Sequence, residues 1–183
     1  MESAYFLMSD ERKEKCNAYL NIDDKKRCIC ADMLLRSVLC DKLKLSSEKL
    51  EFGVNGNGKP YLINGELKFN ISHSGDYVAV AVNENKEVGI DIEKIREISA
   101  HTAKHIFSDS DKLFVFQSEN IPRSKITDPQ TLVRFFKVWT YKEAYSKMTG
   151  EGITDNLKNI SYDENRCTAE VFDNYVLTVV TDK

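Results

Sequence analysis

Residues 131–148, TLVRFFKVWTYKEAYSKM, carry the clearest helical pattern in the chain, and Gly150 marks the end of the predicted helix. At 100° per residue, one face of this helix is apolar and is formed by Leu132, Phe136 and Trp139. Glu143 falls within the same face, and Lys147 follows one turn later. An ion pair between these two would contribute only about 0.2–0.5 kcal/mol and does not explain a carboxylate on the apolar side. The helix therefore predicts a carboxylate that is buried for a functional reason.

Residues 88–93, VGIDIE, are expected to form a strand in which Asp91 and Glu93 share one face with Gly89. A solvent-exposed strand face is the ordinary interpretation of Asp-x-Glu, but two carboxylates on one face repel each other unless a cation lies between them. Gly89 leaves room beside the pair, and Glu143 adds a third carboxylate from another lobe. We therefore predict an oxygen-ligand Mg²⁺ site at Asp91, Glu93 and Glu143, with places left for water and substrate phosphates.

The pattern around these two segments predicts an α+β fold. Besides the helix at 131–148, helices are expected at about 23–44, 99–107 and 111–118, and strands at 50–54, 60–63, 66–71, 77–82, 86–93, 157–162, 168–172 and 175–181. Asp23 and Asp24 are expected to cap the first helix, the Asn-Gly step at 64–65 to turn a hairpin, and 77–82 to be buried on both faces. Because a helix followed by hairpins occurs twice, we predict two similar lobes, 1–96 and 97–183, each with a helix packed on a small antiparallel sheet.

Composition excludes several classes of protein. The net charge of −3 argues against a generally basic nucleic-acid binder. Five cysteines, without a Cys-x-x-Cys pair, argue against a disulfide framework or a zinc site. The sequence shows neither a signal-peptide pattern nor an apolar run of membrane-spanning length, so we expect a cytoplasmic protein with no membrane partner.

A second polar cluster follows the predicted strand at 66–71, in the segment 69–75, FNISHSG. Ser72, His73 and Ser74, with the backbone around Gly75, could cradle an anion. A single His after a strand is typical of a structural residue, whereas the Ser-His-Ser grouping also fits a functional one, so both interpretations stay open. A Gly-x-Ser-x-Gly nucleophile elbow is missing from the sequence, which argues against a hydrolase of that type.

Four segments together resemble one known family. They are Gly58-Lys59-Pro60, the segment FNISHS at 69–74, the segment GIDIE at 89–93, and the segment WTYKEA from Trp139 that continues to Lys147. Taken in this order and at these separations, they are similar to the phosphopantetheinyl transferases of the surfactin-synthetase-activating type, from about Glu11 to Val180.

The resemblance implies transfer of the 4'-phosphopantetheine group from coenzyme A to a serine of an apo acyl or peptidyl carrier protein, with release of adenosine 3',5'-bisphosphate. It implies that Asp91, Glu93 and Glu143 bind Mg²⁺, and that Glu143 and Lys147 are catalytic. The residues that would hold coenzyme A are Arg12, Lys15, Arg27, Lys59, Ser72 and His73. The implied fold has two lobes about a pseudo-twofold axis, with the active site between them, in a monomer.

Several alternatives stay open on the sequence. The serine proton could go to Glu143 or to a water molecule at the metal, and the carrier could belong to fatty-acid, polyketide or peptide synthesis. Asp111 stands where the family commonly has Glu, so its reach toward a metal is shorter. Another magnesium-dependent phosphotransferase or hydrolase acting on a nucleotide, or a non-catalytic coenzyme A-binding module, would carry similar residues. The apolar segment 107–116 is a candidate docking site for the carrier.

Overall fold

The computed structural model of the chain describes residues 5–6, 8–118, 120–122, 124–150 and 155–182. Its helices are α2 (Asp10–Ala18), α3 (Ile22–Leu43), α4 (Ala100–Ile106), α5 (Asp109–Phe116) and α6 (Pro129–Thr149), and its 3₁₀ turns are η1 (Ser47–Lys49), η2 (Asp155–Asn159) and η3 (Glu164–Arg166). Its strands are β1 (Phe52–Val54), β2 (Pro60–Leu62), β3 (Lys68–Ser74), β4 (Tyr77–Asn83), β5 (Val88–Lys94), β6 (Ile98–Ser99), β7 (Lys125–Ile126), β8 (Cys167–Phe172) and β9 (Tyr175–Thr181).

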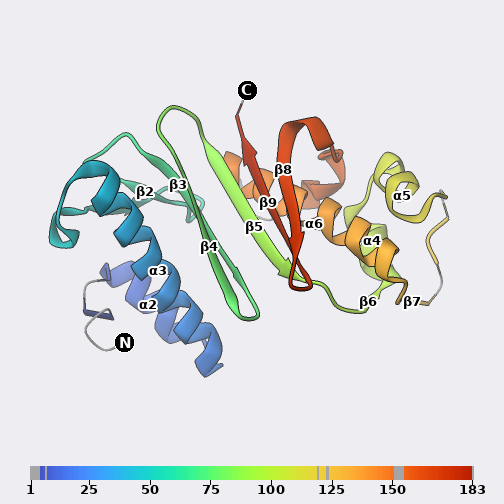
Figure 1. Cartoon of the computed structure of the whole chain (residues 1–183), viewed down its shortest axis with the longest axis horizontal. Coiled ribbons are helices and arrows are strands. Elements are labelled where there is room, and N and C mark those ends of the chain that lie inside the picture. Colours follow the sequence, from blue (N-terminus) through green and yellow to red (C-terminus); the bar gives the residue numbers. More distant parts are fainter. Residues whose placement is uncertain (1–4, 7, 119, 123, 151–154, 183) are drawn as a thin grey trace.

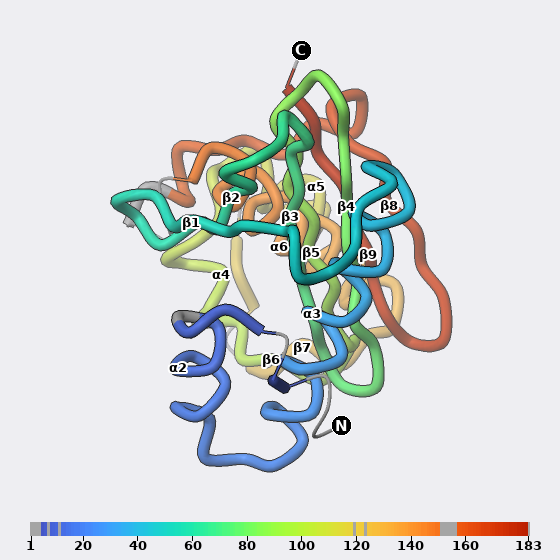
Figure 2. Tube along the Cα trace, turned by 90° about the vertical axis from the view of Figure 1, so that its left-hand side faces the viewer, coloured from blue at the N-terminus to red at the C-terminus, as the bar shows by residue number. Residues whose placement is uncertain are grey.

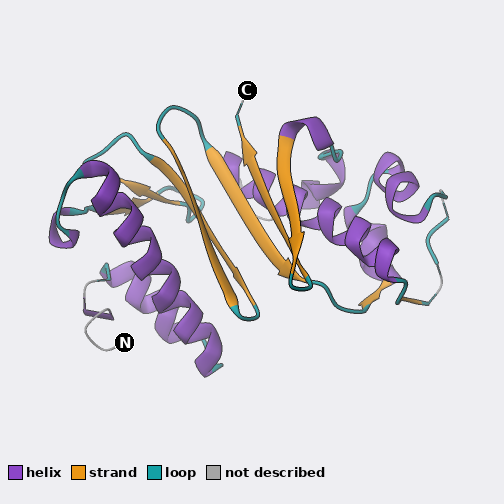
Figure 3. Cartoon of the chain, viewed as in Figure 1, coloured by secondary structure: helices purple, strands orange, loops and turns teal. Residues whose placement is uncertain are grey.

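The strands form small antiparallel sheets, which confirms the predicted α+β class. β3 pairs with β4, and β5, β9 and β8 form a three-stranded sheet in that order. Figures 1 and 3 show β3, β4, β5, β9 and β8 in the middle of the molecule, with α2 and α3 on one side and α4 and α5 on the other. The view in Figure 2 shows that the short β1–β2 hairpin lies to one side of β3.

Helix α6 is fixed at both ends and packs against β5 and β9. Its N-cap Asp128 accepts a hydrogen bond from the Thr131 backbone N–H, and its C-cap Gly150 has a φ of 72°, which favours glycine. A Cβ at Gly89 of β5 would collide with the carbonyl oxygen of Ala144 on this helix. Gly89 therefore provides the room that lets the α6 backbone lie directly on β5.

Two apolar clusters support the two sides of the molecule. On one side α3 packs against the first strands, through Leu35, Leu39, Leu50, Leu62 and Phe69. On the other side α6 packs against α4, α5 and β9, through residues that include Ala103, Phe107, Val115, Phe135, Phe136, Val138 and Val176. Among the described residues no helix is both long and apolar enough to cross a bilayer.

The strands β3 and β5 are joined by side chains rather than by a backbone ladder. Three side chains of β3, two residues apart from one another, accept the backbone N–H groups of three alternate residues of β5. The pairs are Asn70 with Ile90 at 3.0 Å, Ser72 with Ile92 at 3.2 Å, and Ser74 with Lys94 at 3.2 Å. We call this row the β3–β5 seam. It connects the β3–β4 hairpin to the three-stranded sheet and brings the polar face of β3 beside Asp91 and Glu93.

Several local predictions differ from the structure. The N-cap of α3 is Asn21, so Asp23 and Asp24 lie in the first turn of the helix. The step at 64–65 does not turn a paired hairpin, because β2 pairs with β1 and β3 with β4. Every residue of β4 is half-buried rather than buried. The predicted strand at 157–162 is a 3₁₀ turn followed by irregular chain. β5 lies before the predicted lobe boundary at 96 but pairs with β9, which lies after it. The lobe boundary and the pseudo-twofold axis stay predictions.

Candidate active site

One cavity of about 340 Å³ gathers most of the predicted site residues. It is lined by Arg12, Lys15, Ile71, Ser72, His73, Asp91, Glu93, Trp139, Glu143 and Lys147. These side chains come from α2, β3, β5 and α6, which together line this one cavity. Acidic and basic groups therefore face one another in a single hollow, although they lie far apart in the sequence.

Asp91 is buried, and its two carboxylate oxygens differ in their hydrogen bonding. Its Oδ1 accepts hydrogen bonds from Ser72 Oγ at 2.8 Å and from Lys147 Nζ at 2.6 Å. Its Oδ2 is buried and has no hydrogen-bond partner within the described part of the chain. Burial raises the pKa of Asp91, and the ammonium of Lys147 opposes that rise. A buried carboxylate oxygen without a partner costs free energy, and a bound cation would remove that cost.

The other two carboxylates complete the acidic side of the cavity. Glu93 accepts hydrogen bonds from Ser74 Oγ at 3.1 Å and from Arg96 Nη1 at 3.0 Å, both at Oε2. Burial raises the pKa of Glu143 to about 7, and the negative charge of Asp91 adds to the rise. Among the described side chains, no three His, Cys, Asp or Glu residues are already close enough together to hold a metal ion. In this structure the ammonium of Lys147 lies against Asp91, where a cation would bind. The three carboxylates nevertheless fit Mg²⁺, because they offer oxygen ligands and because Oδ2 of Asp91 has no partner in the described structure.

The basic side of the cavity is formed by Arg12, Lys15, His73 and Lys147. Burial lowers the pKa of His73, and the positive charge of Arg12 lowers it further, so the neutral imidazole is favoured. Burial likewise lowers the pKa of Lys15, again assisted by Arg12. Arg12 Nε is buried without a hydrogen bond in the described structure and lies 3.9 Å from Asp32 Oδ1. Such a surface is suited to an anion such as a phosphate.

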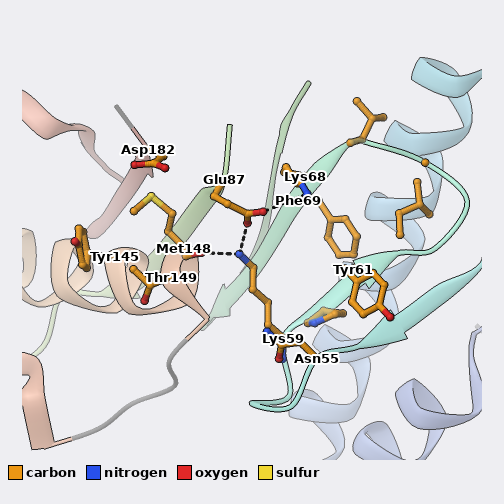
Figure 4. Close-up of a pocket in the computed structure, with 14 residues that line it drawn as sticks. Asn55, Lys59, Tyr61, Lys68, Phe69, Glu87, Tyr145, Met148, Thr149 and Asp182 are labelled. Atoms are coloured by element: carbon orange, nitrogen blue, oxygen red, sulfur yellow. Dashed lines mark hydrogen bonds and ion pairs between the residues drawn. The ribbon is translucent and has the colours of Figure 1, made fainter. Parts of the chain in front are cut away.

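Lys59 and Arg27 are the two predicted residues that the structure does not place around this cavity. Lys59 lines a neighbouring cavity of about 220 Å³, which shares Arg12, Lys15 and Lys147 with the first. Lys59 also lines a third cavity of about 530 Å³, and Figure 4 shows its ammonium directed toward Glu87 and Met148 there. There Lys59 Nζ lies 2.7 Å from Glu87 Oε2 and 2.7 Å from the carbonyl oxygen of Met148.

Arg27 is bound to its own side of the molecule. Its Nη1 donates to the carbonyl oxygen of Gly75 at 2.7 Å, and its Nη2 donates to Asp24 Oδ1 at 2.6 Å. The guanidinium is close enough to lower the pKa of His73, after the effects of burial and Arg12. Arg27 therefore contributes charge to the His73 side of the site while its hydrogen bonds go to other groups.

Asp111 is engaged elsewhere, in a buried ion pair that the sequence did not indicate. Its Oδ2 lies 2.8 Å from Lys142 Nζ and accepts the Ser108 N–H at 2.8 Å, and its Oδ1 accepts the Tyr162 N–H at 2.9 Å. Lys142 also donates to the carbonyl oxygens of Leu157 and Ile160. Both side chains are buried in the α5–α6 region, and neither lines the cavity as the described residues form it. The sequence indicated Ser74 as part of a possible anion cradle, whereas the structure shows it donating to Glu93; no sequence signal indicated Lys142.

Comparison with known proteins decides the family. A model of the 4'-phosphopantetheinyl transferase superfamily matches residues 87–178, half of the chain. The chain belongs to this superfamily. A second model, of the N-terminal part of 4'-phosphopantetheinyl transferases, matches residues 1–85. The resemblance inferred from the four sequence segments is therefore confirmed.

Individual members of the superfamily are similar over most of this chain. The 4'-phosphopantetheinyl transferase gsp of Aneurinibacillus migulanus is 33% identical over 91% of the chain. The transferase Sfp of Bacillus subtilis (strain 168) is 33% identical over 85%. The L-aminoadipate-semialdehyde dehydrogenase-phosphopantetheinyl transferase of Xenopus laevis is 29% identical over 88%. The chain spans 68%, 66% and 55% of the lengths of these three relatives, respectively.

Proposed function

We propose that this chain transfers the 4'-phosphopantetheine group from coenzyme A to a serine of an apo carrier protein in a magnesium-dependent reaction. The observation that carries the proposal is the cavity itself, where Asp91, Glu93 and Glu143 face Arg12 and Lys147. Carboxylates beside a basic surface suit a metal that is shared with phosphates. Membership of the transferase superfamily supplies the choice of reaction.

The three carboxylates would hold Mg²⁺, which favours oxygen ligands and often binds proteins through few carboxylates plus substrate phosphates. When bound, Mg²⁺ supplies positive charge that offsets the negative charge of the phosphoryl oxygens. Arg12, Lys15, Ser72 and His73 would hold the nucleotide end of coenzyme A and its 3'-phosphate. Lys59, in the adjoining cavity, would contact the same ligand if its ammonium left Glu87.

In the proposed transfer, Lys147 acts on the phosphate and Glu143 on the carrier serine. The carrier serine Oγ forms a bond to the phosphorus nearest the pantetheine, and the bond from that phosphorus to the bridging oxygen breaks. Adenosine 3',5'-bisphosphate leaves with the electron pair of that bond. Lys147, which lines the cavity beside Asp91, offsets charge on the phosphate oxygens, and the carboxylate of Glu143 accepts the serine proton. Positioning and electrostatics are the main contributions expected in phosphoryl transfer.

The carrier would dock on α5, which follows β5 and α4 in the chain. Leu113 is 56% exposed on this helix, whereas Val115 is buried. Phe114 is half-buried and its ring lies 4.8 Å from that of Tyr162, so it belongs partly to the core. Leu113 is therefore the apolar residue of α5 that is best placed to meet a partner protein.

The decisive experiment combines purified protein with coenzyme A, Mg²⁺ and separate apo acyl and apo peptidyl carriers, and follows the intact mass of each carrier. We expect the carrier mass to rise by one phosphopantetheine group, with matched release of adenosine 3',5'-bisphosphate. EDTA and an Asp91→Asn variant serve as controls, and both should abolish the mass change. Light scattering of the same sample tests the expected monomer.

The rival functions give different results in the same assay. Release of adenosine 3',5'-bisphosphate without any carrier would indicate a hydrolase or a transferase to another acceptor. Binding of coenzyme A by calorimetry, with no change in any carrier, would indicate a binding module. Either result would overturn the proposed transfer.

A further inference from the structure

Ser74, at the end of β3, makes two hydrogen bonds that connect it to β5. Its Oγ accepts the backbone N–H of Lys94 at 3.2 Å and lies 3.1 Å from Glu93 Oε2. A backbone N–H can only donate, so the hydroxyl has to act as the acceptor in that bond. The proton of the hydroxyl is then left for the neighbouring carboxylate. The backbone of β5 thus sets the direction in which Ser74 donates.

Ser72 repeats this arrangement two residues earlier. Its Oγ accepts the N–H of Ile92 at 3.2 Å and donates to Asp91 Oδ1 at 2.8 Å. In both cases a serine of β3 bonds the N–H of one residue and the carboxylate of the residue before it. In both cases one carboxylate oxygen receives all the hydrogen bonds described above, which are those from Ser72 and Lys147 to Asp91 and those from Ser74 and Arg96 to Glu93.

The third member of the β3–β5 seam has no carboxylate to hold. Asn70 Oδ1 accepts the N–H of Ile90 at 3.0 Å, and the residue before Ile90 is Gly89. This position joins the strands through a backbone group alone. Asn70 is therefore a control within the seam, because it joins the two strands without bonding a carboxylate, whereas Ser72 and Ser74 do both.

We propose that Ser74 is a positioning residue for Glu93, an inference that rests on the proposed magnesium site. Ser74 fixes Oε2 of Glu93 and so sets the orientation in which the carboxylate faces the cavity. Arg96 bonds the same oxygen but its side chain is 57% exposed, so solvent weakens its hold. Residues that orient metal ligands through hydrogen bonds typically affect metal affinity by about 10–100-fold.

The test compares variants of the full chain by calorimetric titration with Mg²⁺ alone and with Mg²⁺ in the presence of coenzyme A. We expect Ser74→Ala to bind Mg²⁺ about 10-fold more weakly than the natural chain. Ser74→Thr, which keeps the hydroxyl, should restore most of that affinity. Arg96→Ala should change it less than Ser74→Ala does.

Asn70→Ala is the matched control, because it also removes one bond of the seam. It should lower the melting temperature about as much as Ser74→Ala does, or more, while leaving the affinity for Mg²⁺ alone nearly unchanged. Equal losses of Mg²⁺ affinity in Asn70→Ala and Ser74→Ala would overturn the inference, since the effect would then come from loosening the strands. Unchanged affinity in Ser74→Ala would overturn it as well. If the natural chain itself binds no Mg²⁺, with or without coenzyme A, the proposed function fails and the inference fails with it.

Discussion

Helix α6 carries two lysine–aspartate pairs five residues apart, and they differ in how fully the carboxylate is satisfied. Lys142 and Asp111 are 0% and 1% exposed, and both oxygens of Asp111 have partners. Lys147 is 30% exposed and pairs with only one oxygen of Asp91, whose other oxygen has no partner in the described structure. A complete set of hydrogen bonds is what a structural ion pair needs. An incomplete set at the wall of a cavity leaves capacity for a ligand.

The largest effect should come from breaking the Lys142–Asp111 pair, in which both carboxylate oxygens have partners. Lys142→Met leaves the Asp111 carboxylate buried without its partner, so we expect the free energy of unfolding to fall by about 3–5 kcal/mol. Urea denaturation measures this loss. Lys147→Met is the matched comparison on the same helix. It should also lower the free energy of unfolding because Asp91 is buried, but by less, since Lys147 is 30% exposed and Ser72 still donates to the carboxylate. Similar losses in the two variants would remove the distinction between the pairs.

A large effect on transfer, with little effect on folding, should follow from Asp91→Asn. The amide keeps an acceptor for Ser72 but removes the charge that a cation needs, so we expect transfer to fall by more than about 100-fold. The melting temperature in EDTA should stay close to that of the natural chain, and added Mg²⁺ should raise it only in the natural chain. Full activity of the variant at low Mg²⁺ would contradict the proposal that Asp91 binds the metal.

The three carboxylates of the cavity were accessible from the sequence, whereas the two lysine–aspartate pairs were not, and the difference has a physical cause. The periodicity of α6 and the alternation of β5 indicated Glu143, Asp91 and Glu93, because burial of a carboxylate on an apolar face conflicts with its solvation. The strand predicted at 175–181 matches β9. These features depend on residues close together in the chain.

The strand predicted at 157–162 failed because distant residues use its backbone groups. Lys142 takes the carbonyl oxygens of Leu157 and Ile160, and Asp111 takes the N–H of Tyr162. A segment whose polar groups are bound in this way has none of them left for a neighbouring strand. Apolar alternation in the sequence gave no indication that a lysine on another element would compete for them.

The pH dependence of the metal-free protein sharpens the contrast at Glu143. Burial raises its pKa from 4.5 to about 7, so the protonated form stabilises the fold below pH 4.5 and that contribution is lost as the pH rises through 7. Glu143→Gln imitates the protonated form at every pH. In EDTA the variant should therefore be more stable than the natural chain at pH 8 and nearly equal to it at about pH 4, as measured by thermal unfolding. A stability difference that does not change with pH would contradict this account.

The smallest expected effect is on carrier binding at α5, the helix that the Lys142–Asp111 pair joins to α6. Leu113→Ser should raise the carrier KM about 5-fold, equivalent to about 1 kcal/mol, without changing stability or coenzyme A affinity. Phe114→Ser should instead lower the free energy of unfolding by about 2 kcal/mol, because its ring packs on Tyr162. Steady-state kinetics and urea denaturation separate the two results. If Leu113→Ser leaves the carrier KM unchanged, the carrier docks elsewhere.

The β3–β5 seam divides the amide protons of β5 between two neighbours. Those of Ile90, Ile92 and Lys94 are held by β3 side chains, while the amides of the alternating residues face β9. A separation of the two sheets would expose only the first set to solvent and leave the second set protected. Hydrogen exchange at alternate residues of a single strand would then report the opening of the cavity separately from the unfolding of either sheet.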